Sequence, residues 1–247
     1  MTVGAVARIV KEFIRTGDEM VSIGVDTGSA RSADARAASF PWMGIGLALI
    51  ATVLSVLAAR GDFFRYDPAV ARWVQGMGGS GLDGLAEAVS WVGLWAPSLV
   101  VIGLVAGAIA RAGDPVGAWF VIGAALLRPV NLAIKWLVDR PRPTAEVVRV
   151  LEVASGLGFP SGHAFSAMAL CVVTAGVMPR VMSGTTLRIA QAISIGLGLL
   201  MGWSRVRLGA HWPSDVLGGW LCGAAMGLLL LWSLPLVDRW REGRLRR

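Results

Sequence analysis

Charged side chains are scarce in this sequence: Asp, Glu, Lys and Arg together make up 16% of its 247 residues, whereas soluble domains carry about 25%. Apolar side chains make up 55%, which excludes a disordered chain and argues against an ordinary soluble enzyme. The only two cysteines, Cys171 and Cys222, both lie inside apolar runs. They supply neither a disulfide framework nor the spacing of a metal site.

Acidic residues are fewer than basic ones, and the formal net charge is +7. The basic residues stand in short clusters at the ends of apolar runs, which is typical of membrane proteins and argues against nucleic acid as a partner. Six of these runs are expected to cross a bilayer, because a spanning helix needs about 20 apolar residues. They cover residues 37–59, 88–110, 115–138, 161–179, 189–203 and 216–237.

The sequence therefore predicts an all-α fold, a bundle of six transmembrane helices. The loop after the first run places Val70, Trp73, Val74 and other apolar residues at helical spacing, which indicates an amphipathic helix at the membrane interface. We expect three parts: an N-terminal segment 1–36, a six-span domain 37–237 and a basic tail 238–247.

The distribution of basic residues predicts the orientation in the membrane. With the N-terminus inside, 13 of the 23 Lys and Arg residues lie in cytoplasmic segments and eight in outer segments, as the positive-inside rule favours. No apolar run precedes a small-residue cleavage site in the N-terminal segment, so no cleavable signal peptide is expected. We expect a multi-pass protein of the inner (cell) membrane with both termini in the cytoplasm.

Histidine occurs only twice, as His163 and His211, and both lie at expected outer ends of spans. Three separate chain segments bring cations to the same membrane face, namely Lys135, Arg140, Arg142, Arg205 and Arg207. A cation cluster with so few acids requires an anion for balance. Phosphate is the densest natural anion at a membrane surface, so we expect a phosphate-binding site here.

The first segment runs from Lys135 to Pro143. Lys135 alone is equally well explained as a snorkelling residue at the end of a span. Pro141 and Pro143 exclude a regular helix, so Arg140 and Arg142 point in opposite directions from an extended turn. One of them can turn back and bind phosphate through its planar fork.

The second segment is Pro160-Ser161-Gly162-His163. Proline favours first helical positions, so a helix is expected to begin at Pro160 or Ser161. The amides of Ser161, Gly162 and His163 then point outward, where they and the helix dipole can bind phosphate. An ordinary helix start is the alternative explanation.

The third segment runs from Ser204 to Asp215 and contains Arg205 and His211. His211 and Asp215 are four residues apart, which places them on one side of a helix that begins near Pro213. A carboxylate bonded to one ring nitrogen fixes the tautomer and orients the other nitrogen as a nucleophile. The alternative is an ordinary helix with an acidic first turn.

Together, the three segments resemble the signature motifs of the type-2 phosphatidic acid phosphatase family, which also includes vanadium haloperoxidases. All the fixed positions are present, in order, and the six-span pattern extends the resemblance over about residues 40–237. The matching motifs are Lys135-x6-Arg142-Pro143, Pro160-Ser161-Gly162-His163 and Ser204-Arg205-x5-His211-x3-Asp215.

The resemblance implies a role for each motif position. His211 attacks phosphorus and forms a phosphohistidine, Asp215 orients His211, and His163 protonates the leaving oxygen. The phosphoryl oxygens are held by a second set of groups: Lys135, Arg142, Arg205 and the amides of Ser161 and Gly162. The resemblance implies neither a metal nor a cofactor, because the site supplies its own positive charge.

Three further arginines stand near these motifs. Arg128 precedes Lys135 by seven residues on nearly the same helix face, about 10 Å deeper, and a charge at that depth indicates a function. Arg128 is either a cation behind the site, in a polar pocket with Asn131, or a structural residue bonded to loose backbone carbonyls. Arg140 and Arg207 are candidates for head-group contact or for a supporting position behind the phosphate-binding groups, and the alternative for both is an exposed loop charge.

The expected activity is hydrolysis of a lipid phosphate monoester or diphosphate at the outer face, with the lipid and the bilayer as partners. From the resemblance we rank undecaprenyl diphosphate first and phosphatidylglycerophosphate or phosphatidic acid next. One alternative is a lipid phosphotransferase that uses the same histidine, and another is a non-catalytic lipid-phosphate binding or transport protein. Six spans argue against haloperoxidase activity.

Overall fold

The computed structural model describes residues 28–60 and 64–245. Most of the expected N-terminal segment 1–36, and Phe63 of the expected amphipathic helix, lie outside the described residues. The chain divides into two compact units, residues 1–40 and 41–247, and the features below belong to the second.

The described residues form helices and no strand, which confirms the all-α prediction. In chain order the helices are α2 (Gly28–Ala59), α3 (Asp67–Gly76), α4 (Ser80–Val92), α5 (Trp95–Arg111), α6 (Pro115–Ala125), α7 (Arg128–Val138), α8 (Gly162–Val177), the short 3-10 helix η1 (Met178–Arg180), α9 (Gly184–Arg207), α10 (Pro213–Trp232) and α11 (Leu234–Leu245).

Five helical segments in the described ranges are long and apolar enough to cross a membrane, and a sixth is obtained if the bent pair α4 and α5 counts as one span. The five are Trp42–Ala59, Pro115–Val138, Gly162–Arg180, Gly184–Arg207 and Pro213–Arg244. The multi-span prediction is therefore confirmed. The helix axes of α4 and α5 differ by 72°, so the predicted run 88–110 is not a straight helix.

Prolines explain the two breaks inside predicted spans. A proline inside a helix clashes with the carbonyl four residues earlier. Pro97 in α5 would meet the carbonyl of Gly93, and α4 ends at Val92. Pro129 in α7 would meet the carbonyl of Ala125, where α6 ends. Both helical runs are therefore interrupted at these positions.

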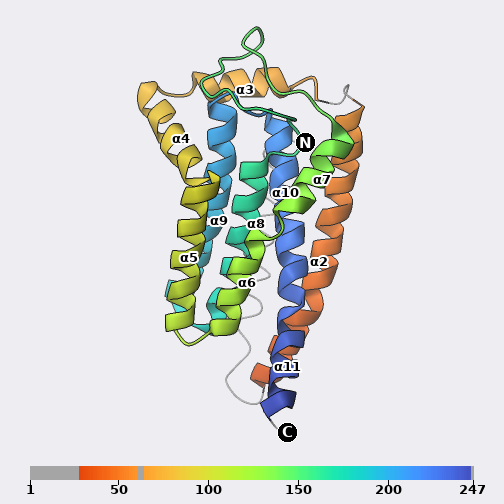
Figure 1. The fold of residues 1–247 in the computed structure, drawn as a ribbon, viewed down its shortest axis with the longest axis vertical. Coiled ribbons are helices and arrows are strands. Elements are labelled where there is room, and N and C mark those ends of the chain that lie inside the picture. The colour runs from red at the N-terminus through yellow and green to blue at the C-terminus, as the bar shows by residue number, and fades with distance from the viewer. Residues whose placement is uncertain (1–27, 61–63, 246–247) are drawn as a thin grey trace. The chain divides into compact units, whose positions relative to one another are not determined.

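Helix α8 lies in the centre of the bundle, against α6, α7, α9 and α10 (Figure 1). Glycines let α10 approach it closely, since a Cβ on Gly223 would lie 2.4 Å from the carbonyl oxygen of Phe165 and one on Gly219 would lie 2.7 Å from that of Ser161. Small residues at such contacts are typical of membrane helices. This packing brings the starts of α8 and α10 together at one end of the bundle.

Helix α3 runs across that same end, over α9 and α10 (Figure 1). It is amphipathic, because the apolar Ala71 and Val74 are buried while the charged Arg72 is exposed. The expected separate helix after the first span is therefore present.

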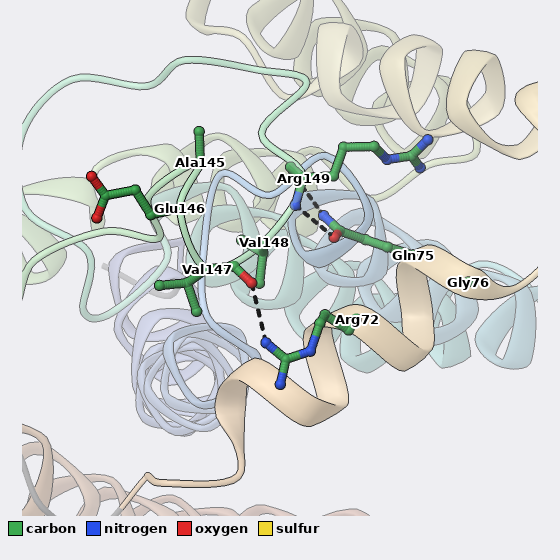
Figure 2. A pocket seen from close by; sticks show the side chains of 8 residues that line it. All are labelled: Arg72, Gln75, Gly76, Ala145, Glu146, Val147, Val148 and Arg149. Atoms are coloured by element: carbon green, nitrogen blue, oxygen red, sulfur yellow. Dashed lines mark hydrogen bonds between the residues drawn. The ribbon is translucent and has the colours of Figure 1, made fainter.

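The long irregular loop between α7 and α8 is tied to α3 (Figure 2). Arg72 Nη1 donates to the Val147 carbonyl at 3.1 Å, Gln75 Nε2 donates to the Arg149 carbonyl at 2.6 Å, and the Arg149 amide donates back to Gln75 Oε1 at 3.1 Å. A shallow surface hollow lies between these residues. The contacts give the loop backbone the partners that it needs without regular structure.

Candidate active site

His211 lies where the α7–α8 loop meets the start of α10. Its side chain is 2% exposed, its Nε2 lies 2.9 Å from Arg142 Nη1, and its Nδ1 lies 3.4 Å from Asp215 Oδ2. A guanidinium has only donors, so Nε2 accepts from Arg142 and carries a lone pair. The ring proton then sits on Nδ1 and faces Asp215, which is the tautomer that a nucleophilic Nε2 requires.

The electrostatic surroundings keep His211 neutral. Burial, followed by the positive charges of Arg142, Lys135 and Arg205, lowers the pKa of His211 well below its usual value of 6.5. A histidine in this state is uncharged near neutral pH and has a free electron pair for attack on an electrophile.

The carboxylate of Asp215 is held by two hydrogen bonds. Its Oδ1 accepts from Arg140 Nη1 at 2.7 Å, and its Oδ2 accepts from the Trp212 amide at 3.0 Å. Arg140 also pairs with Asp67 of α3 at 2.7 Å and donates to Ser214 Oγ at 2.6 Å. The carboxylate that faces His211 is therefore fixed by a buried Asp67–Arg140–Asp215 network.

That network places Arg140 behind Asp215, in a supporting position. Its guanidinium is neither an exposed loop charge nor directed at a head group, because Asp67, Ser214 and Asp215 accept its hydrogen bonds. Asp67 was not singled out from the sequence. It lies 73 residues from Arg140, so no local spacing connects the two.

Lys135 and Arg142 are cations bonded to backbone carbonyls. Lys135 Nζ donates to the carbonyls of Leu157 at 2.7 Å and Gly158 at 3.3 Å. Arg142 donates to the carbonyls of Gly156 at 2.9 Å and Ala210 at 2.7 Å. Carbonyl dipoles orient these two side chains without neutralising them, so both charges remain available to an anion beside His211.

The start of α8 is only partly available for anion binding. The Ser161 amide donates to the Asp215 carbonyl at 2.9 Å, and Ser161 Oγ caps the helix by accepting from the Ala164 amide at 3.5 Å. The Ser161 amide therefore joins α8 to α10. Gly162 and His163 occupy the first helical positions, where backbone amides have no partner within the helix, so these two amides remain the candidates for phosphate contact.

His163 packs against the bend between α4 and α5. A Cβ on Gly93 would lie 2.4 Å from His163 Cδ2, so only glycine fits at that position. The His163 Nε2 is buried and has no hydrogen-bond partner among the described residues. Such an atom is rare and calls for an explanation, and a proton donor to a substrate oxygen provides one.

Arg205 and Glu152 form a two-point ion pair. Arg205 Nη1 and Nη2 donate to the two carboxylate oxygens of Glu152 at 2.7 and 2.8 Å, and Nη1 also donates to Ser90 Oγ. The Arg205 side chain is 1% exposed and that of Glu152 is 34% exposed. Burial raises the pKa of the Glu152 carboxyl, but the bonds and charge of Arg205 more than offset this and lower it. Glu152 and Ser90 were missed from the sequence.

Arg205 and Arg207 lie in the last turn of α9, where the sequence predicted a loop. The helix continues past Trp203 because both buried arginines pair with acids, Arg205 with Glu152 and Arg207 with Asp83. Arg207 Nε donates to Asp83 at 2.7 Å, and its other nitrogens donate to backbone carbonyls between α3 and α4, including that of Val74 at 2.9 Å. Arg207 therefore holds the α3–α4 turn, and the expectation of head-group contact or an exposed loop charge is wrong.

Arg128 differs from all of these cations. It is the first residue of α7, its side chain is exposed, and it makes no hydrogen bond or ion pair with any residue that the structure describes. The expected bonding to loose backbone carbonyls is thus not found there. Asn131, one turn later, is buried and donates to the Pro160 carbonyl at 3.4 Å.

Comparison with known proteins finds similarity to one superfamily of phosphatases. The sequence pattern of the PAP2 superfamily matches residues 116–238. The undecaprenyl-diphosphatase of Sulfolobus acidocaldarius is 30% identical over 105 residues, which is 42% of this chain and 42% of that protein. The decaprenylphosphoryl-5-phosphoribose phosphatase of Mycobacterium tuberculosis (strain H37Rv) is 34% identical over 115 residues, or 45% and 59% of the two chains. The chain thus spans about half the length of these curated relatives.

A solved structure is similar over most of the chain. The transmembrane PAP2-type phosphatidylglycerolphosphate phosphatase from Bacillus subtilis superimposes with a TM-score of 0.68 at 22% identity, and the match covers 80% of this chain and 96% of that one. It confirms the membrane-helix fold.

Proposed function

The chain carries a PAP2 superfamily domain over residues 116–238, and on that premise we propose that it is a lipid phosphatase which hydrolyses a lipid phosphate monoester or diphosphate through a phosphohistidine. The observation that carries the proposal is the position of His211, with its Nε2 against Arg142 and its Nδ1 facing Asp215. A binding or transport protein requires the cations but has no use for an oriented, neutral imidazole.

The first step is attack on phosphorus. The phosphoryl group displaces the Arg142–His211 contact, and Arg142, Lys135 and the Gly162 amide hold its oxygens. His211 Nε2 forms a bond to phosphorus while the bond to the lipid oxygen breaks. His163 gives its proton to that oxygen, and the Asp215 carboxylate stabilises the charged ring of His211.

The second step returns the histidines to their starting states. Water attacks the phosphorus of the phosphohistidine, and the P–N bond breaks with its electron pair returning to His211 Nε2. His163, now without its proton, takes one from the attacking water. Inorganic phosphate leaves and the site is restored.

Undecaprenyl diphosphate is the substrate that we rank first, with phosphatidylglycerophosphate or phosphatidic acid next. Relatives named for prenyl phosphates support the first choice, and a relative from Bacillus subtilis named phosphatidylglycerophosphatase B supports the second. We further propose the inner membrane as the location, with the site at the outer face and both termini in the cytoplasm, as the distribution of basic residues favours.

Phosphate release from the three lipids by the purified protein in detergent, with EDTA present, tests the proposal. We expect release that EDTA does not inhibit and that falls by at least about 10³-fold in His211→Ala, because the nucleophile is lost. Arg65→Ala, which removes an exposed cation bonded only to Tyr66, serves as the matched control and should retain activity. Transfer of the phosphoryl group to a second lipid without free phosphate would instead identify the transferase.

A further inference from the structure

Arg128 is an exposed cation halfway along a predicted membrane span. The helical segment Pro115–Val138 is apolar enough to cross a bilayer, and Arg128 lies at the break between α6 and α7, partway along the bundle (Figure 1). An unpaired charge at such depth is unfavourable and marks a functional position by default. Since the described residues offer it no partner, the compensating anion must come from outside that part of the chain.

Arg128 shares one face of α7 with two residues that bond the start of α8 and the loop before it. Arg128, Asn131 and Lys135 recur at the spacing of one helix face. Lys135 bonds the loop before α8, and Asn131 Nδ2 bonds the Pro160 carbonyl at the start of α8. Arg128 continues this face about 10 Å below Lys135.

The substrate must approach along this face. Its scissile phosphorus has to reach His211 Nε2, while its apolar tail stays among the spans. His163 serves the leaving oxygen in the proposed mechanism, so the leaving group lies on the side of His163. Any group between the scissile phosphorus and the tail therefore passes from His163 toward Arg128.

We propose that Arg128 binds a second anionic phosphate on the tail side of the scissile bond. This inference rests on the proposed function and narrows its substrate class. Lipid diphosphates carry such a phosphate directly next to the scissile one, and phosphatidylglycerophosphate carries it as a diester one glycerol away. Phosphatidic acid has no second phosphate. Arg128 thus selects lipids with two phosphates over those with one.

The test is the ratio of kcat/KM values for two-phosphate and one-phosphate lipids. Undecaprenyl diphosphate, phosphatidylglycerophosphate and phosphatidic acid are assayed with wild type, Arg128→Gln and Arg128→Lys. We expect Arg128→Gln to lose about 10- to 100-fold on the two-phosphate lipids, the range of a charge-assisted hydrogen bond, and less than about 3-fold on phosphatidic acid. Arg128→Lys should restore part of the loss. The two-phosphate lipid whose kcat/KM falls more shows which distance between the two phosphates Arg128 recognises.

Arg111→Gln is the matched control, because Arg111 is an exposed arginine at the opposite end of the bundle and should change no ratio. An equal loss on all three lipids, or no loss on any, overturns the inference. If Arg128→Gln does not fold, Arg128→Met also removes the charge, and an unchanged ratio in that variant overturns the inference as well. Wild-type protein that releases phosphate from no lipid contradicts the proposed function itself, a result separate from all of these.

Discussion

Basic side chains at the two ends of the bundle have different kinds of partners. At the end opposite the site, Arg180 of η1 pairs with Asp114 at 2.6 Å and with Asp238 at 2.7 Å. At the site, Lys135 and Arg142 bond carbonyls and His211 but no carboxylate. A cation paired with acids joins helices, whereas one bonded only to neutral groups keeps its charge for a ligand. Proximity to the site alone therefore does not identify a binding residue.

The same distinction divides the cations of the site. Arg140 and Arg205 are paired with acids. Arg205 Nε is buried without a partner among the described residues, so the predicted contact of Arg205 with a phosphoryl oxygen stays a proposal. Arg142, Lys135 and Arg128 have no acid partner in the described part of the chain. If the distinction is correct, variants of the two groups should differ in how they divide their effect between activity and stability.

Arg142→Ala should give the largest loss of activity among the cation variants. One charged donor aimed at the reacting group contributes about 10²- to 10³-fold, so kcat/KM should fall by that factor. The unfolding temperature in detergent should change little, because no buried acid is left unpaired. A large loss of stability with nearly normal activity would contradict the assignment.

Arg140→Ala should lower the stability more than Arg142→Ala does, and the activity less. It leaves Asp67 and Asp215 buried without their shared cation, and loss of one partner from a buried pair costs about 3–5 kcal/mol. Activity should fall by about 10- to 100-fold, since Asp215 still faces His211 but is less firmly held. Thermal unfolding and kcat/KM measured on the same preparation test both parts. Arg140→Lys should recover stability more than activity if the two-point geometry matters.

Glu152→Gln should have a smaller effect on activity. The amide can keep one hydrogen bond to Arg205 but loses the second charged contact, so we expect kcat to fall by about 10-fold. KM should not rise, because one negative charge is removed beside the phosphate site. Glu146→Gln changes an exposed acid of the same loop and is the control. A raised KM with unchanged kcat would show that Glu152 contacts the substrate instead.

Arg142→Gln should shift the acidic limb of the kcat/KM profile to higher pH. At mildly acidic pH this shift should change the rate by a few-fold. Burial and then Arg142 lower the pKa of His211, so protonation removes the nucleophile only well below pH 6.5 in the wild type. Arg142→Gln deletes one cause, so the pKa should rise and the limb should move to higher pH. Profiles of kcat/KM between about pH 5 and pH 8 test this. A limb that does not move would exclude Arg142 as a cause.

The same depressed pKa has a consequence for stability. Below about pH 6.5 the unfolded chain takes up a proton at this histidine before the folded one does. The free energy of unfolding therefore falls as pH decreases from about 6.5 toward the folded pKa, and rises as pH increases through that window. His211→Asn should remove this part of the dependence.

Local signals in the sequence predicted much of this molecule. Helices α8 and α10 begin at Gly162 and Pro213, where the proline and capping patterns placed them to within one or two residues. His211 and Asp215 face each other as their spacing of four predicted. The sequence did not reveal Asp67 or Glu152, because their partners lie 73 and 53 residues away and only the fold brings them together.

Charge patterns gave wrong predictions where charged residues were used to locate the ends of helices. The predicted fifth span ended at Trp203 because arginines follow it. Helix α9 nevertheless continues to Arg207, since Glu152 and Asp83 compensate those charges. Proline was the better indicator, because Pro97 and Pro129 each lie four residues after the carbonyl at which a helix breaks. A charged residue ends a membrane helix only if it finds no partner, and a partner is a property of the fold.

Arg180→Ala should have the smallest effect on activity and thereby provides the sharpest contrast. Arg180 joins η1 to the N-cap of α6 through Asp114, and to α11 through Asp238. Because the pairs are partly exposed, their removal should destabilise by about 1–2 kcal/mol. Activity should stay within about 2-fold, since α8 separates the two ends and the site contacts none of these residues. A loss of activity comparable to that of Arg140→Ala would mean that the bundle transmits strain along α8. In that case, pairing with acids would not by itself separate structural cations from those that serve the site.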